Sequence, residues 1–328
     1  MSAAPFATLS PDRVLDAVEA LGHRCNGRLL ALNSYENRVY RVGIDEQDAV
    51  IAKFYRAGRW TDAAIAEEHA YALELAAAEI PVVAPIRDAG GRSLFHHGDA
   101  RYALFPNRPG RAPELEHEQT LRWIGRFLGR IHAHGASQAF RHRATLSIDR
   151  LGVEPSRYLL AGGFFPGELR TVYASVVDAA LAGITAAFAR AGTLRFIRLH
   201  GDCHPGNILW TVRGPHFVDL DDCMSGPAIQ DLWMLLAGER EEMGRQMSWV
   251  LEDYADYCDF NYAELLLIEA LRTLRMIHYA AWLARRWEDP AFPLSFPWFN
   301  TQRYWQDHIL SLREQLAAMN EPSLALAG

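Results

Sequence analysis

Residues 200–210, "HGDCHPGNILW", decide the fold of this chain. They place four potential zinc ligands close together, namely His200, Asp202, Cys203 and His204. They also place Asp202 five residues before Asn207, a spacing typical of a loop for phosphoryl transfer. In such a loop the carboxylate faces the acceptor hydroxyl and the amide oxygen faces a metal ion. The rest of the chain has to distinguish the two interpretations.

A further acidic residue favours phosphoryl transfer. Asp219 follows Asn207 by twelve residues, at the end of the apolar run "HFVD", where a second metal ligand is expected. Asparagine oxygen suits Mg²⁺ and is unusual for Zn²⁺, and no spaced pair of zinc ligands occurs elsewhere. Each residue alone could be an ordinary turn residue. Together they predict that Asp202 and Asp219 are catalytic and that Asn207 and Asp219 bind Mg²⁺.

Lysine usage points to the nucleotide. Of 33 basic residues, 32 are arginine and one is Lys53, on the predicted strand 49–56. A single lysine suggests a site that needs a compact ammonium rather than a planar guanidinium. Its acidic partner is expected on the following helix, where Glu68 shares the apolar face and Glu67 the wetter one. We expect Lys53 and Glu68 at the ATP phosphates; the alternative is that both glutamates are solvated.

Composition excludes several classes of protein. Half of the 328 residues are apolar, which is enough for a full core in two lobes. The four cysteines stand far apart, so neither a disulfide framework nor a zinc ribbon is indicated. The net charge of −7 argues against general binding to nucleic acid or an anionic membrane. Without an export signal or an uninterrupted apolar run of about 18 residues, we expect a cytoplasmic protein. We also expect it to be a monomer.

Hydrophobic periodicity predicts two lobes that meet near residue 107. Residues 1–106 are expected to form a small β-rich lobe and residues 107–328 a larger α-helical lobe, an α+β fold. The helices expected in these lobes cover 10–22, 61–79, 117–135, 168–191, 239–257, 262–287 and 300–318. The strands expected in the first lobe are 38–44, 49–56, 82–86, 93–97 and 101–106. The aromatic segment 292–306 is expected to pack in the core, with an acceptor-peptide groove as the alternative.

Two features depart from protein kinases. No glycine-rich loop covers the phosphates; "LNSYENRVY" stands in its place, and Ser34, Asn37 or nearby backbone N–H groups could bond to phosphate oxygens there. Only eleven residues separate Asp219 from Asp231, too few for a phosphorylated activation segment. Asp231 is expected to cap its helix or brace the catalytic loop. Whether Asp221 and Asp222 extend the acidic site or are solvated stays open.

Five segments together resemble the RdoA-type bacterial Ser/Thr kinases of the aminoglycoside-phosphotransferase-like superfamily. They are "LHGDCHPGNILW", "FVDLDD", "GPAIQDLWML", "LNSYENRVYRV" and "KFYRAGRWTDAAIAEEH". The likeness covers nearly the whole chain. It implies a bilobal protein-kinase-like fold, ATP and Mg²⁺, Asp202 as proton acceptor, and nucleotide contact near Ser34. It also implies a role in bacterial stress response.

The expected function is therefore ATP- and Mg²⁺-dependent phosphoryl transfer to a Ser or Thr hydroxyl of protein. One alternative is a small-molecule kinase that acts on an amino alcohol, sugar or aminoglycoside-like acceptor, because the same loop serves both. Another is an inactive nucleotide-binding scaffold. The intact set of Lys53, Asp202, Asn207 and Asp219 disfavours the scaffold.

Overall fold

The computed structural model describes residues 6–326, and the chain divides into two compact units. The first unit holds the chain up to Glu114 together with Phe140–Arg143 and His204–Cys223, and the second holds the remainder. The sequence predicted a single boundary at residue 107. The division differs because a later hairpin joins the first unit: Val83 N–H donates to Phe217 O at 2.9 Å, and Arg111 and Trp210 exchange backbone hydrogen bonds.

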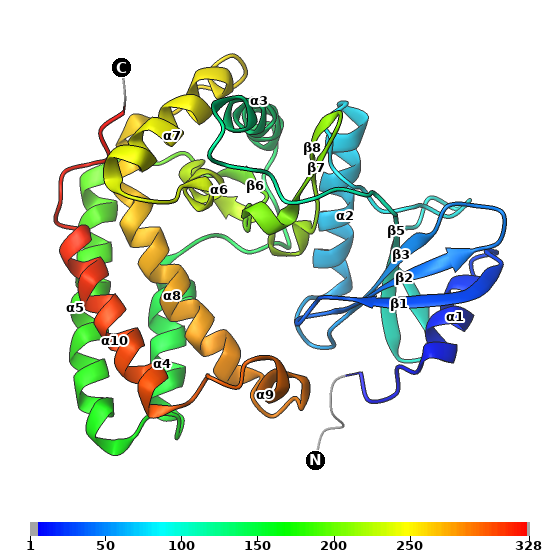
Figure 1. The fold of residues 1–328 in the computed structure, drawn as a ribbon, viewed down its shortest axis with the longest axis horizontal. Helices are drawn as coiled ribbons and strands as arrows, with labels where there is room; N and C mark the ends of the chain where they lie inside the picture. The colour runs from blue at the N-terminus through cyan, green and yellow to red at the C-terminus, as the bar shows by residue number, and fades with distance from the viewer. Residues whose placement is uncertain (1–5, 327–328) are drawn as a thin grey trace. The chain divides into compact units, whose positions relative to one another are not determined.

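A five-stranded antiparallel sheet in the order β1-β2-β3-β5-β4 forms the body of the first unit (Figure 1). Its strands are β1 Cys25–Leu32, β2 Arg38–Ile44, β3 Val50–Tyr55, β4 Phe95–His97 and β5 Ala100–Pro106. Helix α1, Pro11–Glu19, buries Val14 and Val18 against this sheet, and Ser10 caps its first turn. The α+β fold class predicted from the sequence is confirmed.

Helix α2, Asp62–Ala77, carries charged groups into the interior of the first unit. The Thr61 side chain accepts from Ala64 N–H at 3.2 Å and starts the helix. The buried face includes Ile65, Glu68 and Leu75. This is the face that the sequence predicted to point inward.

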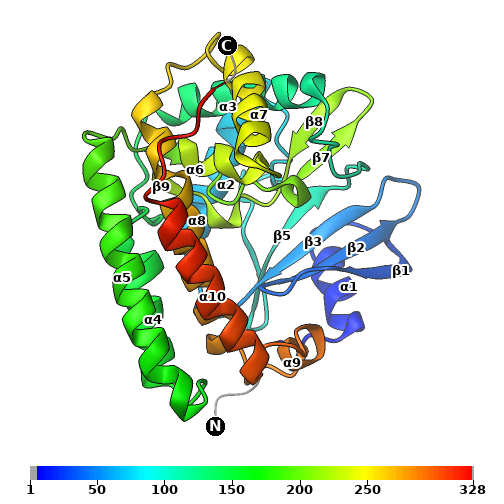
Figure 2. The same ribbon diagram turned by 60° about the vertical axis from the view of Figure 1, so that its left-hand side comes forward.

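The hairpin of β7, Ile208–Thr211, and β8, Gly214–Phe217, directly follows the loop 200–207, which carries Asp202 and Asn207 (Figure 2). Ile208 pairs with Phe217, so Asn207 and Val218 flank the open end of the hairpin. The predicted strand 82–86 is wrong, because only Val82 makes an isolated bridge to Phe217. Pro81 and Pro85 lack the N–H groups that a longer ladder needs.

Strand β1, Cys25–Leu32, was not predicted from the sequence. It lies at the edge of the sheet and most of its side chains are exposed. It therefore lacks the alternation of apolar and polar residues by which a half-buried strand is recognised.

The second unit is built from helices. They are α3 Glu118–Gly135, α4 Glu154–Ala161, α5 Gly167–Ala191, α6 Ile229–Leu232, α7 Arg240–Tyr254, α8 Ile268–Arg285, α9 Ala291–Ser295 and α10 Gln302–Ala318. A π-helical turn at Asp149–Val153 precedes α4, and neither was predicted. The predicted helix 262–287 begins as a 3₁₀ helix, Tyr262–Leu267, before α8. Short strands β6, Ile197–Leu199, and β9, Met224–Gly226, pair antiparallel.

Helix α5 is the part of the described chain that is long and apolar enough to cross a membrane, by length and composition only. Its most apolar window has a mean hydropathy of 1.6. In the structure α5 packs against α10 and α8 (Figure 2), and 33% of that apolar window is buried. The finding is therefore weak support for a membrane span.

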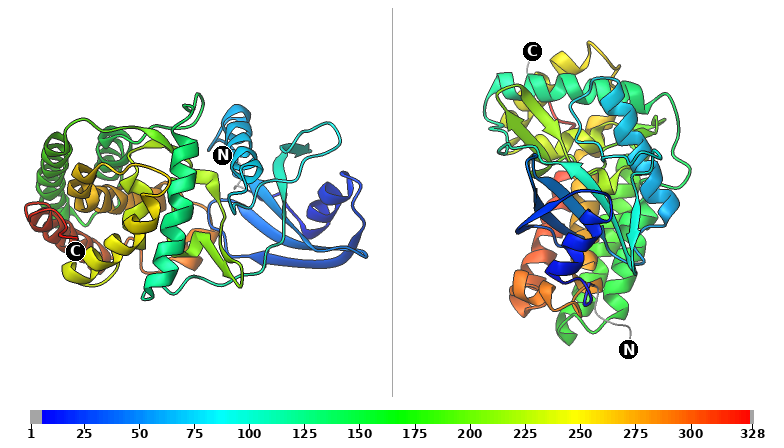
Figure 3. Two further views of the ribbon diagram at one scale, coloured as in Figure 1. Left: turned by 90° about the horizontal axis from the view of Figure 1, so that it is seen from above. Right: turned by 90° about the vertical axis from the view of Figure 1, so that its right-hand side faces the viewer.

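Helices α3 and α7 pack closely side by side, which Figure 3 shows from above. A methyl group on Gly125 of α3 would lie 2.0 Å from the carbonyl oxygen of Val250 in α7. Backbone atoms cannot yield as a side chain does, so the helices approach this closely only because residue 125 is glycine.

We expect Gly125→Ala to destabilise the protein by about 1–3 kcal/mol, because overpacking outweighs the better helix propensity of alanine. Urea unfolding measures the difference. Gly167→Ala, at the start of α5, is the matched control, because nothing lies within 4 Å of its added methyl group. A Gly125→Ala protein as stable as the wild type would contradict this view of the α3–α7 contact.

Candidate active site

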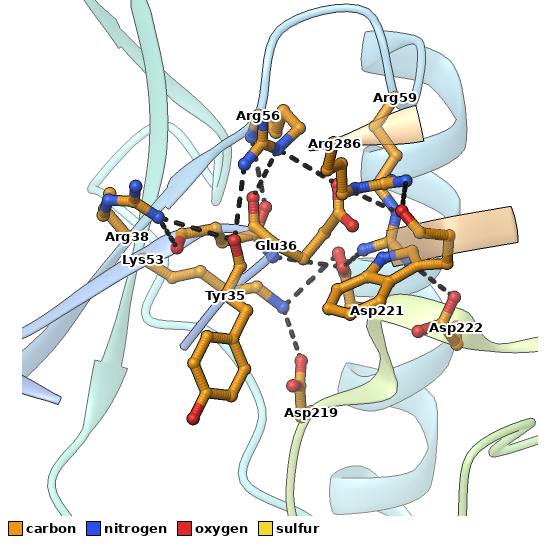
Figure 4. A network of polar contacts seen from close by, with 12 residues as sticks. Tyr35, Glu36, Arg38, Lys53, Arg56, Arg59, Asp219, Asp221, Asp222 and Arg286 are labelled. Atoms are coloured by element: carbon orange, nitrogen blue, oxygen red, sulfur yellow. Dashed lines mark hydrogen bonds and ion pairs between the residues drawn. The ribbon is translucent and has the colours of Figure 1, made fainter. Parts of the chain in front are cut away.

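Lys53 lies on β3 and is almost fully buried among three carboxylates. Figure 4 shows two of them, Asp219 and Asp221. Its Nζ donates to Asp219 Oδ1 at 2.7 Å and lies 3.4 Å from Asp221 Oδ1. The predicted partner Glu68 is buried too, but its Oε1 is 4.0 Å away, at the limit of an ion pair. The structure thus brings Lys53, Glu68 and Asp219 together, with Asp219 as the nearest carboxylate.

Burial and charge set the pKa values of this cluster. Burial disfavours the charged form of Lys53, but Asp219, Asp221 and Glu68 outweigh it and raise the pKa of the ammonium well above its usual range. Burial also raises the pKa of Glu68 to about 7, because Lys53 only partly compensates for the lost hydration. Lys53 is thus charged near neutral pH, while Glu68 titrates there.

Glu67 has a structural role that the sequence did not reveal. Its carboxylate accepts from the backbone N–H groups of Arg141, His142 and Arg143 at 2.6, 2.7 and 2.8 Å. Burial opposes ionisation of Glu67, but these three bonds lower its pKa below the usual range. The alternative in which both glutamates are solvated is therefore wrong: Glu68 is buried, and Glu67 anchors the segment 140–143.

Asp221 is a buried anion held by three groups. Besides Lys53, Arg59 Nη1 bonds to its carboxylate, and Asn37 Nδ2 donates to it at 3.1 Å. Burial opposes its ionisation, yet Lys53 and Arg59 lower its pKa far below the usual range. Arg59 Nη2 also donates to Asp222 Oδ1 at 2.5 Å. Asp221 and Asp222 are thus ion-paired rather than freely solvated.

Arg143 links helix α2 to the loop after β8. Its Nε donates to the carbonyl of Cys223 at 3.0 Å and its Nη2 to the carbonyl of Asp221. Its Nη1 lies 3.8 Å from Glu68 Oε2, and its guanidinium stacks on Trp60 at 3.9 Å from the ring centre. The Arg143 side chain is fully buried, so it fixes the loop that carries Asp219. No motif in the sequence marks Arg143.

The predicted metal ligands Asn207 and Asp219 lie at the open end of the β7–β8 hairpin. Val218 N–H donates to the carbonyl of Asn207 at 3.0 Å, which places Asp219 next in the chain beside Asn207. Asp219 adopts the left-handed conformation, with φ 59° and ψ 61°, which is uncommon for a residue other than glycine. Its side chain is 52% exposed, so one face of the carboxylate is open to solvent.

The loop that replaces a glycine-rich turn is braced by arginines (Figure 4). Arg56 donates to the carbonyls of Glu36 at 2.9 Å and Tyr35 at 3.3 Å. Asn37 is buried and accepts from Arg56 N–H at 3.1 Å, so its amide is occupied by protein partners. Ser34, the predicted phosphate contact, is half-buried, and its side chain makes no hydrogen bond within residues 6–326. Its hydroxyl is thus available to a ligand.

Asp202 lies in the second unit, on a loop that Asp231 braces. The buried carboxylate of Asp231 accepts from the N–H groups of His200 and Gly201, both at 2.8 Å, and contacts His132 Nε2 at 3.1 Å. Gly201 has φ 87°, which an L side chain rarely adopts. The bracing role predicted for Asp231 is therefore observed, and it holds the backbone next to Asp202.

Arg275 of α8 bonds to the Asp202 carboxylate through Nη1, a contact that the sequence did not suggest. Arg275 lies one helical turn after Arg272 and is one of several arginines of α8, so the sequence did not distinguish it as a partner of Asp202. Both partners belong to the second unit.

The zinc interpretation finds no support in the geometry. Cys203 is fully buried, and burial raises the pKa of its thiol well above the usual range, which disfavours the thiolate that zinc binds. Among residues 6–326, no three His, Cys, Asp or Glu side chains gather as metal ligands.

Comparison with known proteins adds the family. The sequence profile of the phosphotransferase enzyme family matches residues 28–268. Stress response kinase A of Escherichia coli K12 is 42% identical over 325 residues, which cover 99% of this chain and 98% of that protein. Serine/threonine protein kinase RdoA of Salmonella typhimurium LT2 is 40% identical, over 98% of this chain and 97% of that protein. The resemblance stated from the sequence is confirmed.

Solved structures share the fold at low sequence identity. Amicoumacin kinase in complex with AMP-PNP, Ca²⁺ and Ami has a TM-score of 0.70 at 18% identity, over 92% of this chain and 91% of that one. The microcompartment-associated aminopropanol kinase has a TM-score of 0.70 at 17% identity, over 93% and 95%. A choline kinase of Cryptosporidium parvum has a TM-score of 0.62 at 12% identity, over 93% and 95%.

The raised pKa of Glu68 predicts how stability depends on pH. A carboxyl group with a higher pKa in the folded than in the unfolded state binds more protons when folded, so its contribution to stability falls as pH rises through about 7. We therefore expect the wild type to lose stability relative to Glu68→Gln between pH 5 and pH 8 in urea unfolding.

Glu67→Gln is the matched control for this experiment. The pKa of Glu67 is lowered, so its contribution is present above the unfolded pKa and is lost only in more acidic solution. Its difference from the wild type should stay constant from pH 5 to pH 8. An equally constant difference for Glu68→Gln would contradict the raised pKa of Glu68.

Proposed function

Because this chain belongs to the phosphotransferase enzyme family, we propose that it transfers the γ-phosphoryl group of ATP, with Mg²⁺, to a Ser or Thr hydroxyl of a protein. It is a kinase, as its relatives are named, and its family implies the use of ATP. The proposal includes a cytoplasmic location and a role in stress response. The support for that role is the name of the relative that is 42% identical.

The single observation that carries the proposal is the Lys53–Asp219 pair at 2.7 Å, beside Asn207. A point-like ammonium next to a carboxylate, with an asparagine beside them on the hairpin, is the set of residues that phosphate oxygens and a hard cation require. Asp219 and Asn207 would hold Mg²⁺, which would offset the negative charge of the phosphates. Lys53 would hold the phosphate oxygens, with Glu68 beside it and Ser34 on the covering loop.

Asp202 would accept the proton of the acceptor hydroxyl. The acceptor oxygen forms a bond to the γ-phosphorus while the bond to the β-γ bridging oxygen breaks, and ADP leaves with that electron pair. The support for this role is the spacing from Asp202 to Asn207 and the Asp231 brace that fixes the loop.

The protein acceptor is favoured by the name of the 40% identical relative, a serine/threonine protein kinase. The second candidate is a small-molecule kinase. The fold is compatible with it, because the amicoumacin, aminopropanol and choline kinases share that fold. These are at most 18% identical, so they support the fold rather than the acceptor.

The test is incubation with labelled ATP and Mg²⁺, alone, with a generic protein, and with a panel of hydroxyl metabolites. We expect label on protein, and we expect Asp202→Asn to abolish transfer while ATP affinity stays within a few fold, because no phosphate contact is lost. Label on a metabolite alone would establish the second candidate. Wild-type turnover by Asp202→Asn would remove that residue from catalysis.

Lys53 provides an independent test of the nucleotide site. A lysine-reactive ATP analogue should modify this one side chain, and excess Mg²⁺-ATP should protect it. The protein has no other lysine, so the only competing amine is at the N-terminus. Label at the terminal amine alone would move the nucleotide site away from Lys53.

A further inference from the structure

The contact between Arg275 and Asp202 is partly open to solvent. The Arg275 side chain is 43% exposed and that of Asp202 is 22% exposed. A partly exposed ion pair contributes little to folding stability. The pair is therefore better placed to act on a ligand than to hold the fold together.

Arg275 uses one guanidinium nitrogen in this contact. Nη1 bonds to Asp202 Oδ1, and the other two nitrogens make no hydrogen bond within residues 6–326. A guanidinium offers five N–H donors in a planar fork that matches a carboxylate or a phosphate. Arg275 can therefore bind a second anion.

A cavity of about 430 Å³ lies along the same face of α8, within the second unit. Tyr279 lines it and follows Arg275 by four residues, so the two side chains neighbour each other on the helix. Trp298, Tyr304 and Thr301 line the side formed by α10 and the segment before it. The volume is that of a small-molecule or side-chain pocket. Helices α8 and α10 run side by side in Figures 1 and 2.

The cavity itself supplies no unpaired charge from its described lining. Arg303 and Asp307 pair with each other at 3.5 Å. His308 is buried, and burial lowers its pKa to about 4, so it is neutral near pH 7. Arg275, by contrast, is a cation that bonds directly to Asp202 within the second unit.

Proton transfer changes the charge balance of the Arg275–Asp202 pair. When the acceptor hydroxyl gives its proton to Asp202, the carboxylate becomes neutral and Arg275 loses its counter-ion. An anionic group on the acceptor, near the hydroxyl, would replace it. A cationic acceptor would instead meet the guanidinium and be disfavoured.

We propose that Arg275 is a specificity-determining residue that binds a carboxylate or phosphate next to the acceptor hydroxyl. The inference rests on the proposed function and names the acceptor class of that same site. The anionic group can come from an acidic residue beside Ser or Thr in a protein, or from a small hydroxy acid. Either acceptor would extend along α8 toward the aromatic cavity.

The experiment compares the wild type with Arg275→Gln, Arg275→Lys and the control Arg313→Gln. Arg313 is an exposed arginine of α10, so its substitution makes the same charge change in the same unit. The acceptors are Ser peptides that differ only in Asp, Asn or Lys flanking residues, with glycerate and aminopropanol as the small-molecule arm. The readouts are kcat/KM for transfer and equilibrium binding of each acceptor without ATP.

We expect the wild type and Arg313→Gln to prefer the Asp peptide to the Asn peptide by about fivefold, the size set by one partly exposed ion pair. That ratio should fall to about one in Arg275→Gln, mainly through KM, and should be retained in Arg275→Lys. A preference for glycerate alone would assign the anion to a small hydroxy acid. An unchanged ratio in Arg275→Gln, or a wild-type preference for Lys peptide or aminopropanol, would overturn the inference.

The binding readout separates this inference from the proposed function. If the wild type phosphorylates no acceptor, the proposed function fails, but binding still tests Arg275. Tighter binding of the Asp peptide to the wild type than to Arg275→Gln would then support the anion site. Equal binding to both proteins would overturn it.

Discussion

The ammonium of Lys53, 2.7 Å from Asp219, is the contact on which the organisation of the first unit depends. Three carboxylates approach one buried cation, which burial alone would make unfavourable for all of them. The strand β3, the helix α2 and the loop after β8 each supply one part of this cluster. Because buried charges must be compensated, the position of each element constrains the others.

Two arginines complete the compensation in a way that lysine could not. Arg59 joins Asp221 to Asp222, and Arg143 joins Glu68 to two carbonyl groups of the same loop. Each uses a planar fork to hold two partners at once, whereas Lys53 acts as a point charge where carboxylates converge. This difference gives a physical reason for one lysine among 33 basic residues.

The sequence predicted what is local and periodic. The spacing from Asp202 to Asn207 and the face of α2 that carries Glu68 follow from motif and helix geometry. Arg143, which bonds to a carbonyl 78 residues away, could not be found this way, because its role depends on pairing across the fold. The contact between Arg275 and Asp202, which are 73 residues apart, could not be predicted for the same reason. Strand β1 could not be predicted from the sequence, because an exposed edge strand needs no alternation of apolar and polar residues.

The loop after β8 contains charged residues whose ion pairs hold it in place. Some kinase loops become ordered only after phosphorylation, when the added phosphate group pairs with arginine side chains. Here Arg59 already pairs with Asp221 and Asp222, and Arg143 already holds the loop carbonyls. Arginine stays protonated at any physiological pH, so these contacts need no modification to form. The short connection from Asp219 to Asp231 is thus consistent with a loop that folding, rather than phosphorylation, holds in place.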